Sequence, residues 1–109
     1  MTPAQRANAV ASVIQRRGAA VTLPDGSTLQ AIDIMGTPKA ARYLRADDLN
    51  APEKLTTVID MAGSVYTNKQ IVPGMIVHFS GIQYQVEAPL HPENEGATCL
   101  IVSVVLSKN

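Results

Sequence analysis

Residues 1–17 place apolar side chains at the spacing of an α-helix. Thr2 can cap such a helix, and Pro3 suits its first position, where a missing N–H costs nothing. Gly18 follows two arginines and is the residue type that commonly ends a helix. We therefore expect a helix over residues 3–17. Its apolar stripe is narrow and mostly alanine, and it consists of Ala7, Val10, Ala11 and Ile14.

A stripe this weakly apolar leaves two interpretations of the helix open. In the first, the helix packs in the ordinary way on the rest of its own chain. In the second, it lies against a neighbouring protein or becomes ordered only on assembly. The pattern alone does not choose between them.

Beyond Gly18 the period of the pattern changes from helical to extended. Residues 75–79 and 82–87 are joined by Ser80-Gly81, and the second of them alternates strictly, which predicts a tight hairpin. Residues 98–106 are rich in β-branched side chains, which predicts a strand in a central position or buried on both faces. Residues 88–96 are polar and are expected to form a loop. Further short strands are expected at residues 20–23, 27–34, 55–61 and, less regularly, 64–67.

One helix followed by six to seven short strands defines a mainly β chain. We expect a small antiparallel β-barrel or sandwich with one N-terminal helix and a long inserted loop. The loop covers residues 35–54, which show no clean period apart from room for one helical turn near residues 39–44. Residues 1–109 are expected to form a single domain, with a helical arm over residues 1–18 and the barrel over residues 19–109.

Nine basic and nine acidic side chains give the chain a formal net charge of zero. A neutral chain is poorly suited to bind nucleic acid through bulk electrostatics, and it lacks the self-repulsion that keeps copies apart. Residues 1–45 carry six Lys or Arg and two Asp, whereas residues 46–109 carry three Lys and seven Asp or Glu. Either these halves bind copies or charged partners, or the split is fortuitous, because sequence halves need not be spatial halves.

The residue types that carry catalysis or bind metals form no recognisable motif. His78 and His91 have no ligand at metal-binding spacing, and Cys99 lies in an apolar run typical of a buried thiol. Asp47 and Asp48 form a pair in the loop that is best explained as a solvated charge cluster. We therefore expect no catalytic residue, no cofactor and no metal.

The apolar runs of the chain are short. None approaches the roughly 20 residues that a membrane helix needs. The N-terminus lacks the apolar core of a signal peptide. A soluble protein made in a reducing compartment is therefore expected.

The segment from Val72 to Val86 is the most distinctive part of the sequence. It contains a Gly-x pair, a β-branched strand, a tight turn and an aromatic-x-Val strand. An acidic loop with a glycine, residues 93–96, and a closing strand, residues 98–102, follow it. This order resembles the head–tail joining (head-completion, or stopper) proteins of tailed bacteriophages, especially the lambda-type head–tail attachment family. The resemblance is close over residues 70–106 and architectural elsewhere, and Met75 stands where the family often has an acidic residue.

The resemblance implies a ring component of the phage neck, assembled as a hexamer or a dodecamer. Such a ring docks on the portal or an adaptor ring after DNA packaging, and it presents the surface for a tail tube or tail-terminator protein. The resemblance leaves open whether the ring contacts the DNA in its channel. It implies neither contact with a membrane nor an enzymatic activity. The protein would be present in the host cytoplasm during assembly and then in the neck of the virion. The helix and the long loop would carry the contacts. The candidate partner-binding residues in them are Arg6, Val10, Ile14, Arg17, Arg42, Arg45, Asp47 and Asp48.

Three other functions stay open at this point. A tail-terminator or tail-completion protein would act on the other side of the same junction. A barrel that binds nucleic acid like an OB-fold could use a basic strip, although the chain has no Trp and only 4% aromatic residues for stacking bases. A small enzyme or ligand-binding barrel would need a pocket with convergent polar groups.

Overall fold

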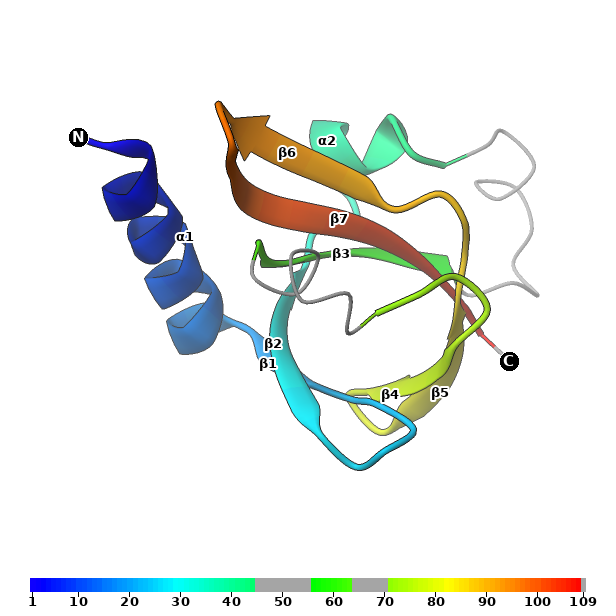
Figure 1. The fold of residues 1–109 in the computed structure, drawn as a ribbon. Coiled ribbons are helices and arrows are strands. Elements are labelled where there is room, and N and C mark those ends of the chain that lie inside the picture. The colour runs from blue at the N-terminus through cyan, green and yellow to red at the C-terminus, as the bar shows by residue number, and fades with distance from the viewer. Residues whose placement is uncertain (45–55, 64–70, 109) are drawn as a thin grey trace.

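The described part of the chain, residues 1–44, 56–63 and 71–108 of a computed structural model, contains two helices and seven strands. They are α1 (Pro3–Arg17), β1 (Ala19–Thr22), β2 (Thr28–Asp33), α2 (Pro38–Ala41), β3 (Thr56–Ala62), β4 (Ile76–Phe79), β5 (Ile82–Val86), β6 (His91–Glu95) and β7 (Thr98–Lys108). Six antiparallel strands pair in the order β3-β2-β1-β4-β5-β7, and β7 returns to β3 to close a barrel (Figure 1). Strand β6 pairs with β7 outside this closed ring of strands. The expected fold class, a small antiparallel β-barrel with an N-terminal helix, is confirmed.

Strand β7 completes the barrel because it borders three other strands. One edge pairs with β3, and the other pairs first with β6 and then, near its end, with β5. All residues from Ile101 to Leu106 are buried. Val102, Val104 and Leu106 belong to the barrel core, whereas Val105 packs in a separate cluster on the outside. The predicted burial of this strand on both faces is confirmed.

The hairpin predicted over residues 75–87 is present as β4 and β5. Val77 pairs with Tyr84, and both side chains belong to the barrel core. Ser80 and Gly81 both have positive φ, 52° and 78°, as the two central residues of a type I′ turn require. The twist of this turn matches the twist of the flanking strands, so the Ser80-Gly81 pair sets the register of the hairpin.

The prediction of a loop over residues 88–96 is wrong, because five of these residues form strand β6. The strand lies at the edge of the sheet, where Pro92 is tolerated although it lacks an N–H. Its two glutamates are held by ion pairs rather than by apolar contacts, so no alternation of hydrophobic residues marks it. The strand expected at residues 64–67 and the loop from residue 45 onward lie outside the described residues.

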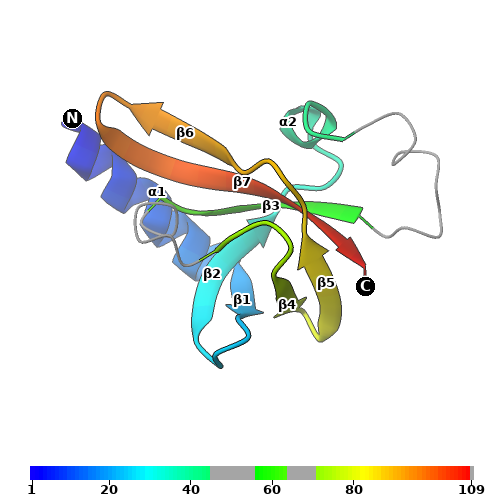
Figure 2. The same ribbon diagram turned by 45° about the vertical axis from the view of Figure 1, so that its right-hand side comes forward.

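Helix α1 packs on its own barrel, against β7, β3 and β2 (Figure 2). Thr2 and Gln5 form a capping box, in which each side chain accepts a hydrogen bond from the backbone N–H of the other. Ile14 is 3% exposed, and the rest of the apolar stripe is half-buried. The helix therefore packs on the rest of its own chain, which is the first of the two interpretations given above.

Gly18 ends α1, but not through the left-handed backbone that its residue type suggests. Its φ of −89° and ψ of −177° are extended values that other residues also adopt. A Cβ at this position would lie 2.3 Å from the carbonyl oxygen of Ala31 and 2.5 Å from that of Ile14. Glycine is required here because the end of α1 and strand β2 approach too closely for a side chain.

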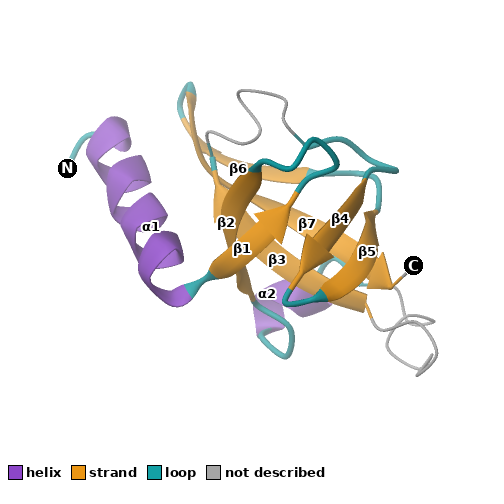
Figure 3. Cartoon of the chain, turned by 90° about the horizontal axis from the view of Figure 1, so that it is seen from below, coloured by secondary structure: helices purple, strands orange, loops and turns teal. Residues whose placement is uncertain are grey.

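Helix α2 covers part of the outer face of the barrel (Figure 3). Ala40 is 1% exposed and packs on Val58 of β3 and Val105 of β7. The helical turn expected near residues 39–44 is thus present at Pro38–Ala41. It fixes the segment that follows it beside the barrel, where this segment forms one wall of a surface hollow.

Candidate functional site

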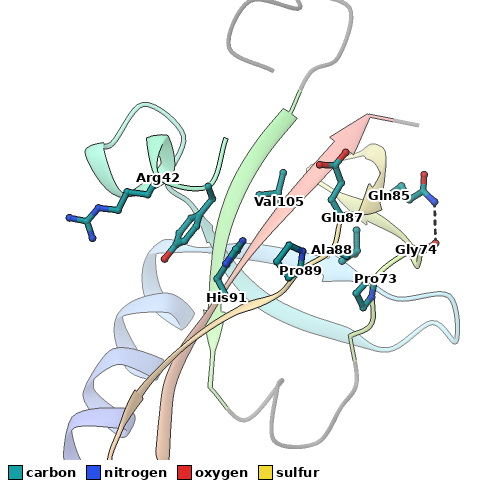
Figure 4. A pocket seen from close by; sticks show the side chains of 11 residues that line it. Arg42, Pro73, Gly74, Gln85, Glu87, Ala88, Pro89, His91 and Val105 are labelled. Carbon is teal, nitrogen blue, oxygen red and sulfur yellow. Dashed lines mark hydrogen bonds between the residues drawn. The ribbon is translucent and has the colours of Figure 1, made fainter. Parts of the chain in front are cut away.

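A hollow of about 650 Å³ opens between the segment after α2, the start of the β4–β5 hairpin and the connection from β5 to β6 (Figure 4). Arg42 stands at one side of it and points away from the other side chains, whereas Glu87, Gln85 and Gly74 stand at the other side. The lining residues are Arg42, Tyr43, Pro73, Gly74, Gln85, Val86, Glu87, Ala88, Pro89, His91 and Val105.

Two stacked rings form one wall of the hollow. The ring centroids of Tyr43 and His91 are 4.2 Å apart, and the ring planes are inclined by 19°. Such a pair contributes about 0.5–1.5 kcal/mol beyond the surface that it buries. Because Tyr43 follows α2 and His91 begins β6, the stack joins two segments that are far apart in the sequence.

The opposite side of the hollow presents hydrogen-bond acceptors. One carboxylate oxygen of Glu87, Oε1, accepts a hydrogen bond from the hydroxyl of Ser107. Among the described residues, no Lys or Arg lies within ion-pair distance of Glu87. The amide nitrogen of Gln85 donates to the carbonyl oxygen of Gly74 at 3.5 Å, so its own oxygen stays available. This side of the hollow is therefore anionic, and Arg42, which also lines the hollow, stands at the other side and forms no ion pair with Glu87.

A polar cluster next to the hollow holds α2 on the barrel. The ammonium group of Lys39 lies 3.1 Å from Asp60 on β3 and 3.1 Å from Glu93 on β6. The buried hydroxyl of Ser103 donates to the other oxygen of Asp60 at 2.6 Å. Partial burial by itself lowers the pKa of Lys39, but the hydrogen bonds to Glu93 and Asp60 outweigh it and leave that pKa raised. The cluster thus favours the protonated amine and ties α2 to two strands.

The raised pKa of Lys39 predicts how its contribution to stability depends on pH. The contribution is complete below the unfolded-state pKa of 10.5 and is lost as the pH rises through the higher folded-state pKa. The Lys39→Met variant is therefore expected to be less stable than wild type at neutral pH, by an amount that shrinks above about pH 10.5. Urea unfolding of both proteins between neutral pH and about pH 11 measures this difference.

Lys108→Met is the matched control for this experiment, because Lys108 is exposed at the end of β7 and has no ion pair with a described residue. Its free energy of unfolding is expected to follow that of wild type across the pH range. A difference between wild type and Lys39→Met that stays constant through the alkaline range would show that the ammonium group does not hold α2.

Every ion pair between described residues joins the basic first part of the sequence to the acidic second part. Arg6 on α1 lies 3.1 Å from Glu95 on β6, within ion-pair distance although out of line for a hydrogen bond. Lys39 makes the other two pairs, with Asp60 and Glu93. Among the described residues, the uneven charge of the sequence is thus partly compensated inside the chain.

The structure places the residues proposed for partner binding in three different situations. Val10 and Ile14 face the barrel of their own chain, so they do not offer an exposed surface while α1 is docked. Arg6 is paired with Glu95. Arg17 and Arg42 are exposed, and neither forms an ion pair with a described residue. Three of the proposed residues lie outside the described residues: Arg45, Asp47 and Asp48.

Apart from Arg42, sequence reasoning missed the residues that build the hollow. Tyr43 and His91 come together only because α2 and β6 lie beside the same barrel face. Glu87 lies directly after β5, where the polar positions of the predicted strand indicated exposure rather than a site. The one available indication was the pair of prolines in the polar segment after Glu87, of which Pro89 lies in the connection from β5 to β6 and lines the hollow.

Few groups in the described chain suit metal binding or nucleophilic chemistry. No group of three or more His, Cys, Asp or Glu side chains in residues 1–44, 56–63 and 71–108 is arranged to hold a metal ion. The Cys99 thiol lies 3.4 Å from the carbonyl oxygen of Ile101, and burial raises its pKa, which disfavours the reactive thiolate. None of the described helices is long and apolar enough to cross a membrane.

The fold and the hollow together define a small closed β-barrel with a mixed apolar and anionic hollow on its side. No protein-family model matches the chain, and neither a curated protein nor a solved structure does.

Proposed function

We propose that this chain is a structural component of the neck of a tailed bacteriophage. The observation that carries the proposal is the order of sequence features from Val72 to Val102, which resembles that of head–tail joining proteins. The helix followed by a small closed barrel is the architecture that this resemblance implies, and it supports the proposal.

In this role, copies of the chain form a hexameric or dodecameric ring in the virion. The ring docks on the portal or an adaptor ring after DNA packaging and presents the surface to which the tail attaches. Neutral net charge suits such close association of identical copies. The function is one of assembly and needs no catalytic group.

The compensation of charge inside the chain favours this role over that of a nucleic-acid-binding barrel. The basic strip of such a binder would consist of Arg6, Arg16, Arg17, Arg42 and Arg45, but Arg6 is paired with Glu95 of the same chain. A binder that relies on phosphate contacts needs its cations free. The remaining exposed cations are better suited to a limited contact with an acidic neighbour.

Deletion of the gene from the phage or prophage genome that carries it is expected to separate heads from tails. Because a neck ring joins two structures that assemble independently, electron microscopy should show heads without tails next to free tails of normal length. The yield of infectious particles should fall to background. Supplying the wild-type gene from a plasmid is the control, and it should restore tailed particles.

The same micrographs distinguish the alternatives. A tail-terminator would instead leave tails of uncontrolled length. Normal yields of tailed, infectious particles without the gene would contradict a role in the neck altogether.

A further inference from the structure

The hollow beside α2 has the chemistry of a slot for a long basic side chain. Its walls include the exposed rings of Pro73 and Pro89 and the stacked ring of Tyr43, which suit an aliphatic stem. At one side of it stands the carboxylate of Glu87, with Oε1 held by the Ser107 hydroxyl and no cation of the described chain within ion-pair distance. An aromatic wall and an uncompensated carboxylate together favour a guanidinium or ammonium group.

The described chain has a cation without a partner at the end of α1. Helix α1 contains three arginines and no acidic residue. Arg6 is paired with Glu95, and Arg16 donates from Nε to the carbonyl oxygen of Ser12. Arg17 is exposed and makes neither a hydrogen bond nor an ion pair with any described residue.

Asp33, which lies close to Arg17 in the fold, does not pair with it. Asp33 lines a smaller hollow of about 270 Å³ together with Arg17, but the two are not within ion-pair distance. Oxygen Oδ1 of Asp33 instead accepts hydrogen bonds from the Thr57 hydroxyl at 2.7 Å and from the Met35 N–H at 2.8 Å. The guanidinium of Arg17 is thus free to reach another molecule.

The free cation and the anionic hollow lie on opposite sides of the molecule. In Figures 1, 2 and 3, α1 lies at one side of the barrel, and β5 with the end of β7 lies at the other. Because the two surfaces lie far apart, Arg17 cannot reach the hollow of its own chain. Arg17 of one copy can, however, reach the hollow of a second copy. Such a contact uses different surfaces on the two copies, so it repeats from copy to copy and generates a ring when the rotation closes.

We propose that the hollow binds the end of α1 from a second copy of this chain, with the Arg17 side chain of that copy paired to Glu87. This contact would be the interface between neighbouring copies in the ring. Its place in a ring rests on the proposed function, which it makes more specific. The planar guanidinium donates to the carboxylate while its stem lies along the apolar wall.

The contact is tested by exchanging the charges of Arg17 and Glu87 in the purified full-length chain. The Glu87→Arg variant places two cations together at every contact, and the Arg17→Glu variant places two anions together. Each alone is expected to weaken self-association about 30-fold or more, measured by sedimentation velocity over a concentration series at low salt. An equimolar mixture of the two is expected to associate again, because each variant then complements the other.

Two controls keep the result specific. Arg16→Glu makes the same change of charge one residue away and is expected to alter association less than about threefold, since it lies on another face of the helix. Glu87→Gln keeps an acceptor for the Ser107 hydroxyl, so it tests the charge of the slot even if Glu87→Arg folds poorly. It is expected to weaken association while leaving the thermal unfolding curve unchanged.

Several outcomes overturn the contact. They are a wild-type chain that stays monomeric at every concentration, a charge-exchanged mixture that stays dissociated, and an Arg16→Glu variant as weak as Arg17→Glu. If wild type is monomeric but Glu87→Gln still blocks particle assembly, the slot binds a basic segment of another protein. Separated heads and tails after gene deletion would leave the neck function standing even if this contact failed.

Discussion

The Leu106→Ala variant is expected to lose about 2–5 kcal/mol of unfolding free energy. Leu106 is fully buried in the barrel core and lies where β7 pairs with Thr57 of β3 on one edge and with Val86 of β5 on the other. A cavity at this position cannot collapse easily, because the strands on both sides are fixed by the closed pairing. Since domains of this size have about 5–15 kcal/mol in total, the loss is a large share of stability.

Urea unfolding measures the loss of unfolding free energy in Leu106→Ala and in the control variant Leu29→Ala. Leu29 is half-buried at the margin of the same core, so the substitution removes the same atoms from a site that is open to solvent. Its loss of stability is expected to be clearly smaller. Equal losses from the two variants would contradict the idea that closure through β7 limits relaxation of the core.

The Gly18→Ala variant is expected to lose about 1–3 kcal/mol and to loosen α1 from the barrel. The added Cβ would lie 2.3 Å from the carbonyl oxygen of Ala31 and 2.5 Å from that of Ile14, and both are backbone atoms that no change of rotamer can move. The end of α1 and strand β2 must therefore separate. Because α1 buries Ile14 against the barrel, that separation also exposes apolar surface.

Limited digestion with trypsin reports the loosening directly, since Arg16 and Arg17 lie in the last turn of α1. We expect faster cleavage there in Gly18→Ala than in wild type. Gly36→Ala is the control, because Gly36 has a φ of +88° but open space around it, so its cost of about 1 kcal/mol is conformational and leaves α1 docked. Cleavage of Gly18→Ala at the wild-type rate, with unchanged stability, would contradict the close-approach explanation.

The elements that the sequence predicts well are those whose burial is organised locally. In β5, alternation places Tyr84 and Val86 in the core and leaves Gln83 and Gln85 exposed, because period 2 is a property of the strand itself. The Ser80-Gly81 turn follows from the two-residue spacing between the strands and from Gly81, which adopts positive φ without steric cost. For these segments, the local sequence is enough to explain the secondary structure and which side chains are buried.

The candidate site could not be predicted in the same way, because its residues come from separate segments. Lys39, Asp60 and Glu93 lie on α2, β3 and β6, and their ion pairs leave no hydrophobic period behind. Strand β6 also has an irregular register between Glu93 and Asn94. Polar residues that satisfy one another across strands look, in sequence, like a solvated loop.

The helix shows a different limit of pattern analysis. The weak stripe of α1 leaves open whether the helix packs on its own chain or on a neighbour, and Val10 and Ile14 are partner-binding candidates only through the family resemblance. An apolar stripe identifies which face of a helix is covered but not which molecule covers it. Here the cover is the chain's own barrel, and Arg17 at the end of α1 stays exposed.

The place of β7 in the barrel also orders events during synthesis. Strands β3 and β5 are translated before β7, and the edges that will pair with it have no partner until residues 98–108 leave the ribosome. Closure of the barrel therefore comes after translation of every other strand. Until then the nascent chain carries two open strand edges, which are sites where unfinished chains adhere to one another. The pairing of β7 with β3 and β5 removes both open edges in one step.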